Sequence, residues 1–182
     1  MADATKRETR LVLLAQSGDR AALEELFESV QNPLGRYVRA ATADPALAED
    51  VLQEVFILIY RKLYWLRDPE LLRPWANRIA SREVVRQLKR RRRWPEQVDE
   101  DSPPEQIAFE PPDAHDSGLT ERLPELLSRV SPASRMVLVL HYLDEMPLAE
   151  VADVLGLPLG TTKSRLAYGL AALRREAGRL MV

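Results

Sequence analysis

Apolar side chains recur every three or four positions along most of the chain, which is the spacing of amphipathic helices. Before residue 94 this spacing predicts three helices, over 20–38, 44–63 and about 71–93. Pro33 should kink or end the first of them, because proline removes a backbone hydrogen bond inside a helix. Asp44 can cap the free amides of the second, and Pro45 suits its first turn.

The C-terminal part of the chain repeats this helical pattern in shorter segments. Helices are predicted there over 119–130, 133–143, 147–155 and 158–175. Ser131 and Pro132, a capping residue and a first-turn proline, separate the first two. The sequence shows no convincing alternation of apolar and polar residues of the kind that strands have. It therefore predicts an all-α fold.

A proline-rich acidic segment separates the two groups of helices. Residues 94–118 contain five prolines and eight acidic side chains, and they contain no lysine or arginine. Such a composition can neither continue a helix nor bury much apolar surface. We therefore expect two small helical domains, residues 1–95 and 119–182, joined by a flexible acidic linker over 96–118.

The segment around Gly156 has the pattern of a helix-turn-helix. A glycine there supplies the left-handed backbone that a sharp turn requires, and Ala152 is small enough for two helices to cross closely. Pro158 suits the first position of the helix that follows. Plain helical hairpins with a glycine turn share this pattern, so a simple packing unit is the alternative interpretation.

The last predicted helix has an apolar and a polar side. Its apolar side consists of Leu159, Thr162, Leu166, Leu170 and Leu173. The opposite side presents a polar stripe, with Lys163 beside it, made of Thr161, Ser164, Arg165 and Tyr168. Free amides at the helix start can bind a phosphate, so this arrangement suits a helix that docks in the major groove of DNA. The alternative is a solvated surface.

The net charge of this 182-residue chain conceals a segregation of charge. Its formal value of −2, taken alone, argues against a polyanionic partner such as DNA. Local patches decide what a surface attracts, however, and residues 86–93 read RQLKRRRR. The third predicted helix therefore carries a row of cations that can follow a phosphate backbone: Arg78, Arg82, Arg86, Lys89, Arg90 and Arg93. Charge runs of this kind are usually only solvated, which is the alternative.

The composition narrows the function classes further. The 46% hydrophobic content supports folded cores, and the absence of cysteine excludes disulfides and thiolate zinc sites. Membrane insertion is not expected, because no apolar run approaches the roughly 20 residues that span a bilayer, and a cytoplasmic location fits. The sequence offers no glycine-rich phosphate loop, no paired acids with a histidine and no metal-ligand spacing. Neither an enzyme nor a cofactor is expected.

Two stretches resemble the extracytoplasmic-function sigma factors, the small two-domain members of the bacterial sigma-70 family. One reads DVLQEVFILIYRKL at 50–63 and LRPWANRIASREVVRQLKRRRR at 72–93, and it looks like the family's polymerase-binding and minus-ten helices. The other reads LGLPLGTTKSRLAYGLAALR at 155–174 and is similar to the family's minus-thirty-five element. The resemblance implies a subunit that directs RNA polymerase to promoters.

Carried over residue by residue, the resemblance assigns three sets of side chains. The polymerase-binding set is Asp50, Gln53, Glu54, Ile57 and Arg61. The minus-ten set is the cation row together with the aromatic residues Tyr64 and Trp65, since unpaired bases stack on aromatic rings. The minus-thirty-five set is Thr161, Lys163, Ser164, Arg165 and Tyr168. Arg82 departs from the family, in which many members carry Asn there, and Trp75 suits the core better than the DNA site.

The resemblance also implies the partners. They are core RNA polymerase, through its largest and second-largest subunits, and promoter DNA. Family members often have an anti-sigma protein, so the resemblance also allows such a partner for this chain. The family implies that the acidic linker enters the RNA path of the polymerase as a nucleic-acid mimic, and a plain flexible spacer is the alternative. A two-component or quorum-type regulator can end in a similar hairpin, but the strand-rich receiver or ligand domain that would precede it is not evident in the sequence.

Overall fold

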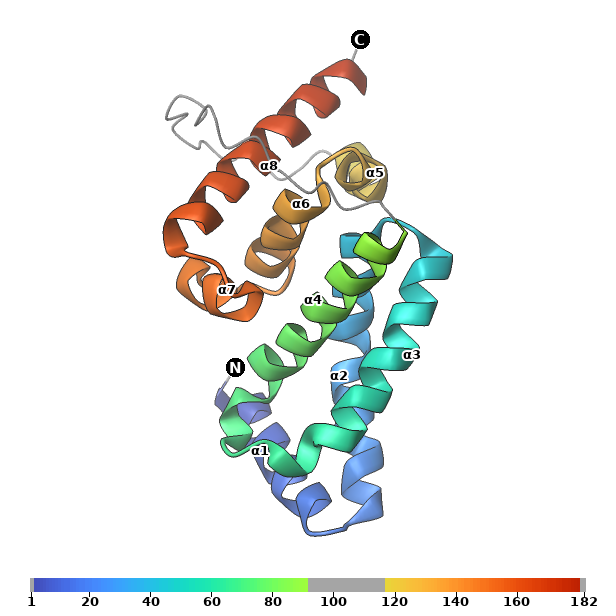
Figure 1. The fold of residues 1–182 in the computed structure, drawn as a ribbon, viewed down its shortest axis with the longest axis vertical. Helices are drawn as coiled ribbons and strands as arrows, with labels where there is room; N and C mark the ends of the chain where they lie inside the picture. The colour runs from blue at the N-terminus through green and yellow to red at the C-terminus, as the bar shows by residue number, and fades with distance from the viewer. Residues whose placement is uncertain (1, 92–116, 181–182) are drawn as a thin grey trace.

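The computed structural model describes residues 2–91 and 117–180, and both ranges are built from helices (Figure 1). Within these ranges there are no strands, which agrees with the all-α fold that the hydrophobic spacing predicts. The N-terminal half comprises α1 (Ala2–Gln16), α2 (Arg20–Thr42), α3 (Pro45–Lys62) and α4 (Leu72–Arg90). Two short 3-10 turns connect α3 to α4, namely η1 (Leu63–Trp65) and η2 (Pro69–Leu71).

Local capping explains where the helices of this half begin. The Asp44 carboxylate accepts a hydrogen bond of 3.1 Å from the amide of Leu47, so the predicted cap of α3 is confirmed. Asp19 caps α2 in the same way, through the amide of Ala22 at 3.1 Å. Pro33 does not end α2, because the helix continues to Thr42. The predicted helix over 20–38 is therefore four residues too short at its end.

The helix α1 is not among the elements that the sequence predicts. Its buried apolar residues are Leu11 and Val12, whereas Arg7 and Glu8, which precede them, form ion pairs with Glu25 and Arg73. Arg73 of α4 forms a two-pronged ion pair with the buried carboxylate of Glu8, with the shortest nitrogen–oxygen distance at 2.8 Å. Such pairing depends on residues 65 positions away, so no local apolar pattern reveals it.

The core of the N-terminal half lies between α2, α3 and α4. Its fully buried members include Leu26, Val38, Leu47, Val51, Val55, Ala80 and Val84. One polar contact crosses this core, between the hydroxyl groups of Tyr37 and Ser81 at 2.6 Å. Burial raises the pKa of Tyr37, so the phenol stays neutral and its polar end is satisfied by Ser81.

The C-terminal half comprises α5 (Ser117–Ser128), α6 (Pro132–Leu138), α7 (Leu148–Leu155) and α8 (Leu159–Leu180). A π-helical segment, η3 (Val139–Leu143), continues α6, so the predicted helix over 133–143 changes its hydrogen-bond pattern midway. Gly156 ends α7 with φ 67° and ψ 38°, which confirms the predicted left-handed turn. Ala152 is buried as predicted, whereas Leu159 is 43% exposed at the start of α8.

A close approach of α8 to α6 involves Gly169, which the sequence does not single out. A Cβ atom at this position would lie 2.7 Å from Cδ1 and 3.0 Å from Cγ of Leu138 on α6. Leu138 is itself buried, so it has little room to move. Glycine is therefore required here by packing and not by a turn.

Replacing Gly169 by Val is expected to lower the free energy of unfolding by about 2 kcal/mol, because added methyl groups overpack a filled core. Urea unfolding followed by circular dichroism measures the change. Gly178→Val is the matched control on the same helix, since nothing lies within 4 Å of its added Cβ, and it should leave stability unchanged or slightly higher. An equal loss in both variants would contradict the packing argument.

The two halves pack against each other (Figure 1). The helix α4 contacts α7, and α2 contacts α5, α6 and η3. Buried apolar side chains of both halves form one continuous cluster, which runs from Leu11 to Val154 in sequence. The two groups of helices that the sequence predicts are therefore closely associated in this conformation.

Candidate polymerase and nucleic-acid interfaces

The residues that the sequence predicts to bind polymerase lie along the outer side of α3. Asp50, Gln53, Ile57 and Arg61 are exposed, and Glu54 is half-buried. Tyr60 adds an aromatic ring to this surface, at 64% exposure, and the sequence prediction missed it. The α3 face, as we call these six residues, thus combines carboxylates, an arginine and exposed apolar groups.

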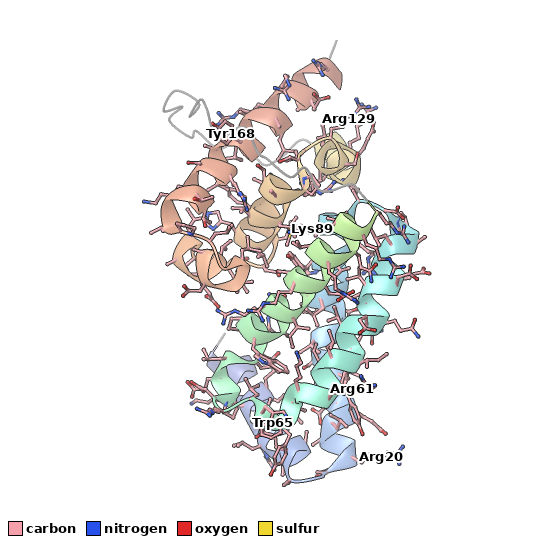
Figure 2. The ribbon with its side chains drawn as sticks, viewed as in Figure 1. Arg20, Arg61, Trp65, Lys89, Arg129 and Tyr168 are labelled. Carbon is pink, nitrogen blue, oxygen red and sulfur yellow. The ribbon has the colours of Figure 1, made fainter. Side chains whose placement is uncertain are left out.

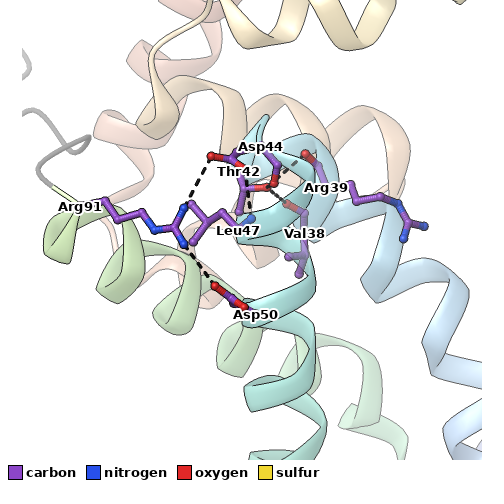
Figure 3. Close-up of polar contacts among 7 residues, drawn as sticks. All are labelled: Val38, Arg39, Thr42, Asp44, Leu47, Asp50 and Arg91. Atoms are coloured by element: carbon purple, nitrogen blue, oxygen red, sulfur yellow. Dashed lines mark hydrogen bonds and ion pairs between the residues drawn. The ribbon is translucent and has the colours of Figure 1, made fainter.

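Asp50 has an intramolecular partner that the sequence did not suggest. Arg91, directly after α4, places one guanidinium nitrogen 3.1 Å from a carboxylate oxygen of Asp50 and another 3.7 Å from Asp44 (Figure 3). The Asp50 side chain remains 64% exposed, and exposed ion pairs contribute little to stability. A protein partner can therefore displace Arg91 from this carboxylate with only a small loss of free energy.

The turn η1 presents two aromatic rings to solvent. Tyr64 is 72% and Trp65 76% exposed, and the rings meet edge to face with centroids 5.8 Å apart. The flanking residues Leu63 and Leu66 are buried. The turn is thus anchored at both ends by leucines, while the aromatic pair stands outside the core. Figure 2 labels Trp65 near the lower end of α3.

The cation row on α4 is exposed along its described length. Arg78, Arg82, Arg86, Lys89 and Arg90 all reach the surface, while Arg93 lies outside the described residues. Arg86 is bound by both oxygens of the buried Glu83, at 2.7 Å each, and this hydrogen bonding raises its pKa. Part of its charge is therefore compensated within the protein.

A groove between α4 and α7 brings the aromatic turn and the cation row together. This cavity of about 570 Å³ is lined on the N-terminal side by Trp65, Trp75 and Arg78, and on the C-terminal side by Glu150, Asp153 and Val154. Arg78 donates a hydrogen bond of 2.8 Å to the carbonyl of Asp153, near the C-terminal end of α7, and the same carbonyl accepts the amide of Gly156 at 3.3 Å. Trp75 is partly buried against the core, as predicted.

The polar stripe on α8 is less open than the sequence suggests. Lys163 is exposed, whereas Thr161, Ser164, Arg165 and Tyr168 are half-buried. The Ser164 hydroxyl donates to the carbonyl of Gly160 at 3.1 Å, which leaves it only as an acceptor for DNA. Figure 2 shows Tyr168 on α8 in the C-terminal half and Lys89 on α4 in the N-terminal half, so the two proposed DNA sites lie on separate helices. Among these side chains, the arginine offers the planar fork of donors that a guanine recognises.

A second, polar cavity lies where α2, α4 and the η3–α7 loop meet. Its volume is about 290 Å³, and it is bordered by Arg36, Arg73, Asn77 and Asp144 among others. The Asn77 amide donates to Asp144 at 3.3 Å, across the two halves. Burial raises the pKa of Asp144 from 3.8 to about 6, and this effect is opposed by Arg36, by the Asn77 hydrogen bond and by Arg73.

The raised pKa of Asp144 predicts a pH-dependent stability. A carboxyl with a higher pKa in the folded state stabilises the fold while it is protonated, so stability falls as the pH rises from about 4 through about 6. Asp144→Asn removes the ionisation and should raise unfolding free energy at pH 8 by about 1–2 kcal/mol after allowance for solvent screening.

Urea unfolding at pH 8 and at pH 4.5 tests this expectation. The advantage of Asp144→Asn over the wild type should shrink at the lower pH, because Asp144 is then protonated in the folded protein. Glu28→Gln, at an exposed carboxylate on α2, serves as the control for removing one charge. A constant difference between Asp144→Asn and the wild type at both pH values would contradict the assignment.

Among the described residues, no group of three or more histidine, cysteine or acidic side chains is placed to hold a metal ion. None of the helices in residues 2–91 and 117–180 is long and apolar enough to cross a membrane.

Comparison with known protein families identifies both halves. Residues 26–94 match the family model described as Sigma-70 region 2, and residues 126–175 match Sigma-70, region 4. The first match contains the α3 face, the aromatic turn and the cation row, and the second contains the helix-turn-helix. The order of the two regions agrees with the order that the resemblance implies.

Individual relatives extend this match over most of the chain. The RNA polymerase sigma-E factor of Streptomyces avermitilis is 30% identical over 165 residues, which are 87% of either chain. The ECF RNA polymerase sigma factor SigL of Mycobacterium tuberculosis is 30% identical over 164 residues, 88% of this chain and 91% of SigL. A solved structure of CnrH in complex with the cytosolic domain of CnrY has the same fold, with a TM-score of 0.68 at 22% identity over 95% of this chain and 98% of the other. The chain therefore belongs to the extracytoplasmic-function group of the sigma-70 family, the RNA polymerase sigma factors that direct promoter-specific transcription initiation.

Proposed function

We propose that the N-terminal half docks on core RNA polymerase through the α3 face and captures the unpaired minus-ten strand, while α8 reads duplex DNA at the minus-thirty-five element. The observation that carries this proposal is the groove in which Trp65 and Arg78 meet. An exposed aromatic ring beside a row of cations offers stacking for bases and charge for phosphates. Both are required to hold a single strand.

The two DNA contacts require the halves to separate. Promoter elements named for positions ten and thirty-five lie about 25 base pairs apart, roughly 85 Å at 3.4 Å per pair. In this conformation Arg78 of α4 is hydrogen-bonded to Asp153 of α7 at 2.8 Å, so α7 covers part of the proposed minus-ten site. We infer that the contacts between α4 and α7 break when the chain engages a promoter.

The connecting segment is long enough for such a separation. Residues 92–116 number 25, and a fully extended chain of this length spans roughly 85 Å. Two weak contacts joined by a tether reinforce each other, because binding of one half raises the effective concentration of the other. The role of the acidic linker as a nucleic-acid mimic, rather than a spacer, remains part of this proposal, and its residues lie outside the described ranges.

Partners of the chain follow from the family. We propose core polymerase, through its largest and second-largest subunits, and promoter DNA as binding partners, with an anti-sigma protein as a third. CnrH, which shares the fold, is bound to the cytosolic domain of CnrY. A protein partner of this chain could act by holding the two halves together, since the minus-ten site is partly covered in the closed arrangement.

Transcription with purified components tests the proposed function. Core polymerase, with and without the protein, is incubated with genomic fragments of the bacterium that encodes it, and the 5′ ends of the transcripts are sequenced. We expect start sites that core polymerase alone does not use, sharing two sequence elements upstream. Failure of the protein to bind core polymerase under any condition would refute the proposal.

A further inference from the structure

We propose that Gln16 is a positioning residue for promoter melting, because its side chain fixes the turn that presents Tyr64 and Trp65. This inference rests on the proposed function of the aromatic pair and names a residue that supports it from another helix. Gln16 ends α1, outside residues 26–94 that match the family model. Neither the sequence pattern nor the family match assigns it a role.

The geometry of the contact is specific. The amide nitrogen Nε2 of Gln16 donates one hydrogen bond to the carbonyl of Leu63 and another to that of Leu66, both at 2.8 Å. A side-chain amide nitrogen carries two hydrogens, so these two bonds use its full donor capacity. A single nitrogen at the end of α1 therefore bridges the two carbonyls.

The two carbonyls bracket the aromatic pair. Leu63 and Leu66 lie immediately before and after Tyr64 and Trp65, and the amide of Leu66 donates to the carbonyl of Leu63 at 3.0 Å. Gln16 therefore closes the turn from outside, while the backbone closes it from within. With both ends fixed, the rings remain on the surface although burial would otherwise favour large apolar groups turning inward.

Fixing the turn in advance bears directly on strand capture. A loop that must be ordered at the moment of binding loses affinity for the ligand, whereas a preordered loop does not. Tyr64 and Trp65 make only an edge-to-face contact with each other, with centroids 5.8 Å apart, and are more than two-thirds exposed. The polar bridge from α1 thus supplies order that ring packing does not.

The test uses full-length protein with core polymerase and a promoter identified from its own transcripts. Gln16→Leu keeps the bulk and removes both hydrogen bonds, and Gln16→Glu replaces the donor by an oxygen that faces two carbonyls. Melting is followed by fluorescence of 2-aminopurine placed in the minus-ten element. We expect both variants to open the promoter about five- to tenfold more slowly, as the loss of two modest hydrogen bonds implies, with polymerase affinity within about twofold of wild type.

Two controls separate positioning from general stability. Gln31→Glu makes the same substitution at an exposed glutamine of α2 and should not alter melting. Amide hydrogen exchange of residues 63–66 should accelerate in both Gln16 variants while the exchange of the core amides stays unchanged. Slower melting without faster exchange in the turn would overturn the positioning role.

A double-mutant comparison distinguishes failure of this inference from failure of the proposed function. Replacing both Tyr64 and Trp65 by Ala should slow melting, and adding Gln16→Leu to this pair should cause no further loss, because both rings that Gln16 positions are gone. If Trp65→Ala slows melting and Gln16→Leu does not, the inference is wrong and the proposed function stands. If Trp65→Ala and Tyr64→Ala are both without effect, the proposed minus-ten site is itself wrong, and the role of Gln16 falls with it.

Discussion

Reversing the charge of both Asp50 and Glu54 with lysine is expected to weaken binding to core polymerase by about 100-fold or more, as when several charged contacts of an interface become repulsive. Both residues belong to the α3 face, and Asp50 is exposed. The protein itself should remain folded. Surface substitutions seldom change unfolding free energy by more than about 0.5 kcal/mol, and the lost pair with Arg91 is solvent-exposed.

Affinity for core polymerase, measured by fluorescence anisotropy of labelled protein, checks this expectation. The matched control is Glu49→Lys with Glu125→Lys, which makes the same change of net charge at exposed positions outside the α3 face. It should leave affinity within a few-fold of the wild type, a loss that long-range charge alone explains. Comparable losses in both double variants would show that net charge, and not the α3 face, governs binding.

Arg91 sharpens this prediction. It holds Asp50 at 3.1 Å in the free protein, so polymerase must displace it to reach the carboxylate. Arg91→Ala removes the competitor and should leave the affinity unchanged or raise it by a small factor, the size expected for an exposed ion pair. A strong loss of affinity would instead place Arg91 itself in the interface.

The parts of the fold that could be predicted are those encoded by local chemistry. The Asp44 cap and the left-handed Gly156 each depend on one residue and its immediate neighbours, and both are where the sequence predicts them. The helices from α2 to α8 follow from apolar spacing in the same way. Their limits do not follow in the same way, because α2 continues past Pro33 to Thr42.

The unpredicted parts all involve partners that are distant in sequence. Glu8 holds α1 in place through Arg73. Arg78 donates to a backbone carbonyl of α7, and since every residue carries a backbone carbonyl, no residue type in the sequence marks this partner. Gly169 resembles any surface glycine until the buried Leu138 is placed beside it. The packing of the two halves against each other was unpredicted for the same reason. In a sequence, the apolar residues between the halves look the same as the residues inside each core.

The same distinction applies to the candidate sites. Helical periodicity identified Asp50, Gln53 and Arg61 as one exposed side of α3, since those positions depend only on the helix they occupy. Periodicity could not show that Glu83 neutralises part of the charge of Arg86, or that the Ser164 hydroxyl donates its hydrogen bond to the carbonyl of Gly160. Nor could it show that Gln16 hydrogen-bonds to the turn that carries Tyr64 and Trp65. The contacts of Arg86 and Ser164 occupy charges and donors that a DNA contact would otherwise use.

On α8 this reasoning concentrates base recognition on Arg165. The hydroxyl of Ser164 can accept but not donate, and the tip of Lys163 is an exposed point charge suited to a phosphate. Arginine alone on this stripe can donate two parallel hydrogen bonds to a guanine edge. We therefore expect Arg165→Ala to cost roughly 1–3 kcal/mol on the cognate minus-thirty-five element and to flatten the preference at one or two base pairs.

Lys163→Ala provides the contrast within the same turn of helix. A phosphate contact carries no sequence information, so this variant should weaken binding to all sequences by about the same factor and reduce the slope of log affinity against log salt by about 0.9. Binding of holoenzyme containing each variant is measured against single-base variants of the element at several salt concentrations. If Arg165→Ala weakens every sequence equally and also reduces the salt slope, Arg165 binds the backbone, and base reading must come from Thr161 or Tyr168 on the same stripe.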